Sequence, residues 1–159
     1  MSEEFEQISL KPGFMKHNGG VLFRKISENE YEFKSTINEN HLNAAGITHG
    51  GYLSALVDAG AGTAAHRSAE NAPCVTISLD LKFIGASKIG DEITGNVKIQ
   101  KKTKTLVFLF IAINKTTHVF LFYRGKKPFA VLTGCHLVMP CLVPPARIDG
   151  NQGRLQRSF

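Results

Sequence analysis

The sequence predicts an α+β fold in which a curved antiparallel sheet of five to six strands wraps around one long helix. A chain of 159 residues with 43% hydrophobic content can bury one sizeable core but hardly two. Residues 50–68 form a single long run with little β-branching, and stretches rich in β-branched and aromatic residues flank it on both sides. One helix and this many strands cannot build a doubly wound sheet, so we expect the sheet to curve around the helix.

The N-terminal part is predicted to hold a short helix followed by a β-hairpin. Residues 3–16 fit a short amphipathic helix that ends before the turn signal His17-Asn18-Gly19-Gly20. Val21 to Ser27 and Tyr31 to Ile37 are rich in β-branched and aromatic residues, and the polar turn Glu28 to Glu30 joins them. We therefore expect two paired strands before the central helix.

The central helix over residues 50–68 has no polar stripe of ordinary width, because nearly all of its residues are apolar or small. A helix of this kind is expected to be buried on nearly every side. Gly60 and Gly62 each disfavour the helix by roughly 1 kcal/mol relative to alanine. Their presence predicts that another backbone comes very close to the helix at this point.

The second half of the chain is predicted to form an antiparallel meander. Apolar residues alternate with polar ones from Val75 to Phe83, a period of two that is typical of a half-buried strand. Further strands are expected at Glu92 to Gln100, Leu106 to Ile113, Val119 to Tyr123 and Phe129 to Val138, with a basic turn at Lys101 to Lys104 after the first of them.

Residues 1–138 are interpreted as one domain, and residues 139–159 as an irregular, basic, proline-containing tail. The acidic start does not resemble a signal or transit peptide, and the longest apolar run, residues 106–113, is too short to span a bilayer. Three cysteines with no CxxC pair argue against a disulfide framework and against a zinc site. We therefore expect a cytoplasmic protein that does not bind membranes.

Nineteen Lys and Arg against thirteen Asp and Glu leave a net charge of +6, which suits a polyanionic partner. No basic helix, stacking aromatic set or zinc spacing accompanies the charge, so nucleic acid is not expected. A phosphate-bearing small molecule and plain solubilising charge on turns both remain as explanations.

Asp58 is the only acid in the apolar helix, and no Lys or Arg lies three or four residues away to pair with it. An unpaired buried carboxylate costs several kcal/mol, so its presence needs a reason. Asp58 either accepts hydrogen bonds from buried hydroxyl or backbone groups, or it is catalytic. The helix opens with His49, Gly50 and Gly51, where backbone N–H groups are accessible to an anion or a developing oxyanion.

The run Asn43-Ala44-Ala45-Gly46-Ile47-Thr48-His49-Gly50-Gly51, with Asp58 following, resembles the signature of the phenylacetate-pathway-type hotdog-fold thioesterases. The similarity continues through Ala72 to Ile77 and Ser87 to Glu92 and covers roughly residues 18–106. Beyond residue 106 the apolar stretches are longer than the family pattern, and the tail is foreign to it. The resemblance implies a hotdog fold and hydrolysis of an acyl-CoA thioester to a free acid and CoA.

The resemblance also implies roles for individual residues. The Gly50 N–H polarises the thioester carbonyl, and Asp58 acts as general base for water or as nucleophile. Asn43 orients the water or the carbonyl, Thr76 holds the water or Asp58, and His49 shapes the turn. Ordinary roles stand beside these: Asn43 as a turn residue, His49 as a packing histidine, and Thr76 as a strand hydroxyl.

Acyl-CoA is thus the expected partner, and Lys101, Lys102 and Lys104 are candidates for contacting the CoA phosphates. No cofactor and no metal are expected, because the other histidines lack paired ligand spacing. The apolar strands need burial beyond what one helix covers, which predicts a homodimer or homotetramer. A hydroxyacyl-thioester dehydratase using His49 with Asp58, and a non-catalytic acyl-CoA-binding module, are the alternative functions.

Overall fold

The computed structural model describes residues 3–116 and the backbone of residues 117 and 130–140. Its elements are β1 (Glu6–Ile8), α1 (Phe14–His17), β2 (Val21–Ser27), β3 (Glu30–Thr36), η1 (Glu39–His41), α2 (Gly50–Ser68), β4 (Ser78–Asp80), β5 (Asp91–Lys102), β6 (Leu106–Thr117) and β7 (Ala130–Pro140). In the described part of the chain, no helix is both long and apolar enough to cross a membrane.

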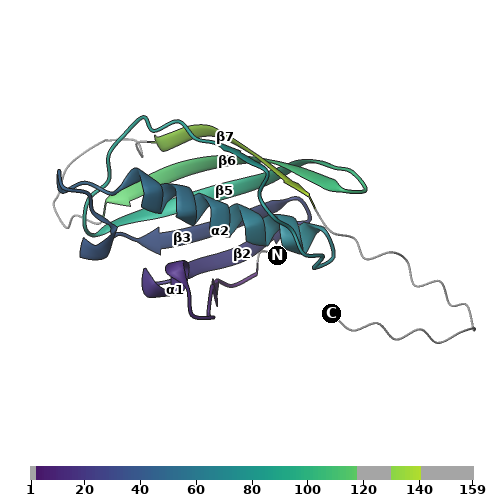
Figure 1. The fold of residues 1–159 in the computed structure, drawn as a ribbon, viewed down its shortest axis with the longest axis horizontal. Helices are drawn as coiled ribbons and strands as arrows, with labels where there is room; N and C mark the ends of the chain where they lie inside the picture. Colours follow the sequence, from purple (N-terminus) through teal and green to yellow (C-terminus); the bar gives the residue numbers. More distant parts are fainter. Residues whose placement is uncertain (1–2, 118–129, 141–159) are drawn as a thin grey trace, which may run out of the picture.

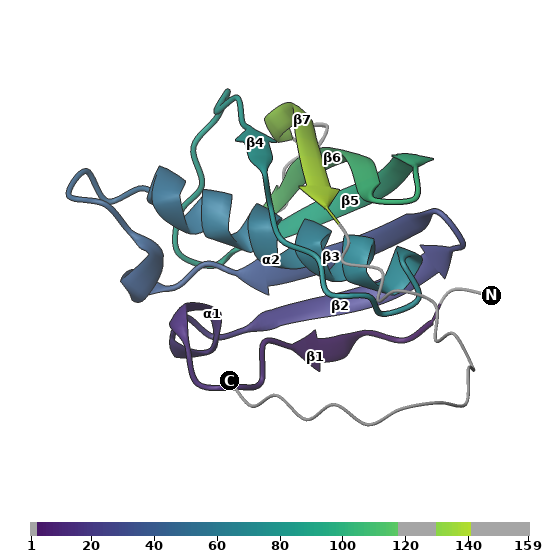
Figure 2. The same cartoon turned by 45° about the vertical axis from the view of Figure 1, so that its right-hand side comes forward.

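Seven antiparallel strands form one sheet in the order β1-β2-β3-β5-β6-β7-β4, and α2 lies across one face of it (Figure 1). The predicted α+β class, with one long helix against a curved antiparallel sheet, is confirmed. In the described residues the sheet has seven strands rather than five or six, and β1 is the strand that was not predicted. β1 lies beside β2, and β4 lies beside β7 (Figure 2).

The core fills the space between the sheet and α2. Inward-facing residues of β2, β3, β5 and β6 alternate with outward-facing ones, as the two-residue period of a strand requires. Phe33 on β3 is fully buried, and its ring lies where a Cβ at Gly60 would stand, at 2.2 Å. The same ring lies 2.1 Å from a Cβ at Gly95 on β5. A ring, rather than a second backbone as predicted, therefore explains Gly60.

The N-terminal helix predicted over residues 3–16 is wrong in most of its length. Residues 6–8 are instead strand β1, paired with β2 in the register Glu6↔Phe23 to Ile8↔Val21, and the helix is one turn, Phe14–His17. The exposed edge of β2 offers backbone hydrogen bonds to the N-terminal segment. Pairing with that edge overrides the weak local preference for helix.

The strand predicted from Val75 to Phe83 is reduced to β4, Ser78–Asp80, which pairs with β7. The apolar side of the alternating pattern is only partly buried: Leu79 and Leu81 pack against the core, whereas Val75, Ile77 and Phe83 are 60%, 62% and 50% exposed. The two ends of the apolar face are therefore left uncovered in the described part of the chain.

Helix α2 has the predicted limits but not the predicted burial. Eight of its residues are buried, whereas a stripe of mostly small residues on the opposite side is exposed or half-buried. That stripe comprises Gly51, Ser54, Ala55, Asp58, Ala59, Gly62, Thr63, His66 and Arg67. A helix buried on one side only is consistent with a single sheet covering it.

Strands β5 and β6 are longer than predicted, because β5 continues to Lys102 and β6 continues to Thr117. Lys101 and Lys102 thus end a strand, and the turn begins at Thr103. The predicted last strand is observed as β7, while the strand predicted at Val119 to Tyr123 lies outside the described residues.

Candidate active site

A groove of about 550 Å³ runs along the outer stripe of α2, between the helix and the segment that leads to β4. Its walls are formed by small helix residues and by residues 73–76. The lining comprises Asp58, Ala59, Gly62, Thr63, His66, Pro73, Cys74, Val75 and Thr76. The groove is thus largely apolar, with polar groups at Asp58, Thr76 and His66, which is the usual make-up of a small-molecule site.

Asp58 lies exposed in this groove rather than buried as predicted. The Thr76 hydroxyl donates a hydrogen bond of 2.5 Å to Asp58 Oδ1, which joins the helix to the segment before β4. Thr76 is half-buried and cannot rotate away without losing this bond. The structure therefore brings together two of the residues singled out in the sequence and fixes the orientation of the carboxylate.

The start of α2 presents one free backbone donor. His49 is the N-cap, and its Nδ1 accepts the Gly51 N–H at 2.8 Å. Among the described residues no acceptor binds the Gly50 N–H, as is normal for the first residue of a helix. The Phe83 ring lies 3.5 Å from the position that a Cβ at Gly50 would take. Of the two glycines, Gly50 is thus the one that can donate to a ligand.

Asn43 closes the turn that precedes this helix. Its Oδ1 accepts the Ala45 N–H at 2.9 Å and the Ile47 N–H at 3.4 Å, and its backbone N–H donates to the Ile47 carbonyl. Gly46 takes φ of +74°, a left-handed value that a side chain would disfavour. Asn43 is therefore a turn residue, and with Oδ1 engaged, its Nδ2 is the group left to donate to a ligand.

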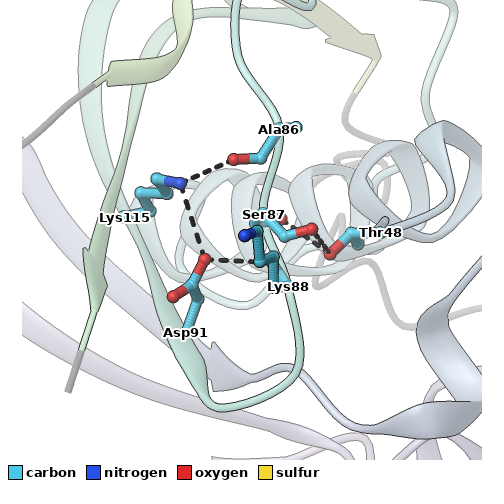
Figure 3. Close-up of polar contacts among 6 residues, drawn as sticks. All are labelled: Thr48, Ala86, Ser87, Lys88, Asp91 and Lys115. Atoms are coloured by element: carbon cyan, nitrogen blue, oxygen red, sulfur yellow. Dashed lines mark hydrogen bonds and ion pairs between the residues drawn. The ribbon is translucent and has the colours of Figure 1, made fainter. Parts of the chain in front are cut away.

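A buried hydroxyl pair anchors the loop between Asn43 and α2. Thr48 is 6% exposed and donates to the Ser87 carbonyl at 3.1 Å, while the Ser87 hydroxyl donates to Thr48 Oγ1 at 2.7 Å (Figure 3). The Thr48 N–H also donates to the Ser87 carbonyl, at 2.9 Å. Three hydrogen bonds thus hold Thr48, which lies two positions before Gly50.

The segment carrying Ser87 is itself held by a buried ion pair. Asp91 Oδ2 accepts the Lys88 N–H at 3.0 Å and lies 3.6 Å from Lys115 Nζ (Figure 3). Lys115 also donates to the Ala86 carbonyl at 2.7 Å. Because the Asp91 side chain is only 4% exposed, its charge needs these partners. This network was not predicted, since nothing in the spacing of these residues indicates that residues 48 and 87 meet.

Within one chain Gly50 and Asp58 do not face each other. They are eight residues apart on α2, which corresponds to about 12 Å along the helix axis at 1.5 Å per residue. A single thioester carbonyl cannot contact both groups at that distance. Asn43 and Gly50 therefore lie at one place along the chain, and Asp58 and Thr76 at another.

The basic turn lies near the other end of α2. Lys101, Lys102 and Lys104 are exposed, and Lys102 Nζ donates to the Ser68 carbonyl, the last of the helix, at 2.8 Å. Lys102 thus satisfies a free carbonyl at a helix C-terminus, where a cation is favourable. Lys101 and Lys104 extend into solvent beside it.

Sequence reasoning missed His66 and Cys74, which line the groove two turns beyond Asp58. His66 Nδ1 bonds the Ala72 carbonyl at 2.8 Å, so this nitrogen carries the hydrogen. The sequence signal that could have identified His66 is its spacing of eight residues from Asp58 on the helix. Among the side chains that the structure describes, those of residues 3–116, no group of three His, Cys, Asp or Glu is placed to hold a metal ion.

Comparison with known proteins shows the family to which the chain belongs. Residues 45–119 match the model of the thioesterase superfamily. Mouse acyl-coenzyme A thioesterase 13 is 31% identical over 107 residues, which cover 67% of this chain and 76% of that protein.

Two solved structures share the fold. Zebra fish thioesterase superfamily member 2 has a TM-score of 0.66 at 23% identity, covering 84% of this chain and 89% of that one. The PaaI protein of the E. coli phenylacetic acid degradation operon has a TM-score of 0.60 at 19% identity, covering 80% and 83%. This chain, as its motif indicated, is a hotdog-fold member of the thioesterase superfamily.

Proposed function

We propose that this protein hydrolyses the thioester of an acyl-CoA to a carboxylic acid and CoA. The observation that carries the proposal is the Asp58 carboxylate, held by Thr76 in an open groove on the helix whose first N–H is free at Gly50. An oriented carboxylate and a free backbone donor are the two groups that acyl transfer to water requires. The family and the acyl-CoA thioesterase among its relatives support the same substrate class.

In the proposed reaction the Gly50 N–H donates to the thioester carbonyl oxygen and stabilises the negative charge that develops there. Asp58 either takes a proton from a water molecule that attacks the carbonyl carbon, or attacks that carbon itself to form a mixed anhydride that water then hydrolyses. In both routes the C–S bond breaks, and the CoA sulfur leaves and takes up a proton to become the thiol. The Asn43 amide donates to the carbonyl or to the water, because its oxygen is already bonded within the turn. Thr76 holds Asp58 in position.

The complete site is proposed to form between two copies of the chain. Two α2 helices packed antiparallel about a twofold axis would bring Asn43 and Gly50 of one subunit to Asp58 and Thr76 of the other. The separation of about 12 Å between Gly50 and Asp58 along one helix supports this arrangement.

The uncovered apolar surface supports the same assembly. Small residues on the outer stripe of α2 allow a second helix to approach closely, and five large apolar side chains of residues 75–89 are at least half exposed. They are Val75, Ile77, Phe83, Ile84 and Ile89. We assign this surface to a second copy of the chain, because the proposed site is complete only when two copies meet.

Release of free thiol from a panel of acyl-CoA substrates tests the proposal, with Asp58→Asn as the blank. Thiol release by the wild type but not by the variant is expected. Loss of water from a hydroxyacyl-CoA without thiol release would indicate the dehydratase, and binding of acyl-CoA without any turnover would indicate a binding module. Either result would overturn the proposed hydrolysis.

A further inference from the structure

His41 is the most deeply buried ionisable side chain beside the start of α2. It is 1% exposed, and its ring stacks on the Tyr52 ring with centroids 3.7 Å apart and planes inclined by 8°. The Tyr52 hydroxyl is bonded in turn to the Ser35 hydroxyl at 2.8 Å. His41 therefore links η1, to which it belongs, to the first turn of α2.

Both ring nitrogens of His41 are engaged with backbone groups that define its tautomer. The Asn38 N–H, 3.1 Å from Nδ1, can only donate, so Nδ1 is unprotonated. The Asn18 carbonyl, 3.0 Å from Nε2, can only accept, so Nε2 carries the hydrogen. The geometry thus requires a neutral imidazole.

His41 contacts the helix start on both sides of Gly50. Its backbone carbonyl accepts the N–H of His49, the N-cap, at 2.7 Å, and its ring stacks on Tyr52, two residues after Gly50. A change in the position of His41 therefore moves the residues that set the direction of the Gly50 N–H.

We propose that neutral His41 is a positioning residue that holds the Gly50 N–H in place, and that protonation of His41 at Nδ1 releases it. The inference rests on the proposed function for its consequence in catalysis, but the coupling between His41 and Gly50 is a property of the fold alone. The step takes one proton from solvent onto Nδ1 and breaks the bond from the Asn38 N–H, because two N–H groups then face each other.

Among the residues that the structure describes, no neighbouring charge offsets the imidazolium. The group that α2 presents to the ring is the Tyr52 phenol, whose pKa burial raises, so it stays neutral. Glu39 of η1, His49 of α2's cap and His17 beside Asn18 are all exposed. Burial lowers the pKa of His41, and the bond to the Asn18 carbonyl opposes that shift without reversing it.

The direction of the pH effect follows from this lowered pKa. Above about pH 6.5, the ordinary value for histidine, His41 is neutral in both the folded and the unfolded chain, and its hold on the helix start is complete. As the pH falls from there through the lowered folded-state pKa, that contribution is lost. The proposal thus predicts an acid limb in this pH range that is lost when His41 is replaced.

Nuclear magnetic resonance of the full chain tests the coupling without any substrate. The His41 ring nitrogens, the Asn38 amide and the Gly50 amide are expected to titrate with one shared midpoint below pH 6.5. In His41→Asn, which keeps an acceptor near Nδ1 but cannot take up a proton, this step should vanish from Gly50. It should persist in His17→Gln, the exposed control, and in Asp58→Asn.

A Gly50 amide that does not move with the His41 titration, down to the pH at which the protein unfolds, would overturn the proposal. This wild-type measurement decides the matter even if His41→Asn fails to fold.

Kinetics test the consequence for catalysis: the kcat of the wild type should fall to about a tenth of its plateau one pH unit below the midpoint, with KM unchanged. His41→Asn should lack that fall. If the wild type releases no CoA from any acyl-CoA while its His41 and Gly50 signals still titrate together, the proposed hydrolysis fails and the role of His41 stands.

Discussion

The Asp58 carboxylate lies in an open groove and receives the Thr76 hydroxyl, so substrate and water can reach it while its orientation is held. We expect Asp58→Asn to leave the fold intact, because the side chain is exposed and the amide oxygen can still accept from Thr76. kcat should fall at least about a hundredfold, the scale for removing an acid–base group. A variant with an unchanged circular dichroism spectrum and near-normal turnover would refute the role of Asp58.

The backbone N–H of Gly50 can be removed with little cost to the helix. Gly50 is the first residue of α2, a position at which proline is tolerated, and His49 already has the extended ψ of 130° that precedes proline. Gly50→Pro should therefore fold but lose on the order of 3 kcal/mol of transition-state stabilisation.

Gly50→Ala is the matched control, since its Cβ would lie in ordinary contact, 3.5 Å from the Phe83 ring, and it keeps the N–H. The alanine variant should keep most of the kcat of the wild type. Equal losses in the proline and alanine variants would point to a steric effect and remove the evidence for an oxyanion donor.

At the level of the elements, the packing of α2 on the sheet depends on the contact between Gly60 and the Phe33 ring. A Cβ at Gly60 would lie 2.2 Å from the Phe33 ring, so Gly60→Ala should destabilise the fold by about 1 to 3 kcal/mol despite the better helix propensity of alanine. Urea unfolding measures this. Adding Phe33→Leu should recover part of the loss, and two strictly additive effects would contradict the packing explanation.

The turn between β5 and β6 brings lysines beside the C-terminus of α2. Changing Lys101, Lys102 and Lys104 to Gln together should raise KM for acyl-CoA roughly three- to tenfold, because exposed charge pairs contribute about 0.2 to 1 kcal/mol each. A short acyl thioester without the nucleotide should be unaffected.

Two comparisons separate phosphate binding from other effects of these lysines. Replacing the exposed Lys11, Lys16 and Lys98 by Gln removes the same charge elsewhere and should leave KM unchanged. Equal effects on both substrates would instead trace to the bond from Lys102 to Ser68 and to the helix end.

At the level of the whole molecule, the divided site predicts complementation between inactive chains. Asp58→Ala and Asn43→Ala chains, unfolded together and refolded in equal amounts, should form mixed dimers as half of the total, each with one intact site. Roughly a quarter of wild-type activity should return. Mixtures that exchange subunits and stay inactive would show that both groups act within one chain.

Local patterns in the sequence determined the elements whose formation depends on neighbouring residues. The glycine pair and the long run without β-branching predict α2 from Gly50 to Ser68, and the alternating apolar residues predict the β2–β3 hairpin and β5. The motif from Asn43 to Asp58 likewise identified the family and, within it, the residues proposed to act.

Only the tertiary structure decided which surfaces meet. Residues 6–8 became a strand because the edge of β2 was open, and Gly60 is required because Phe33 points at it from another element. Val75, Ile77 and Phe83 are at least half exposed although the pattern of residues 75–83 is that of a half-buried strand, since a period of two indicates a face but not its partner. Asp58 is exposed, Thr48 meets Ser87, and His41 meets Tyr52 for the same physical reason: contacts between residues distant in the chain depend on packing, which no local pattern encodes.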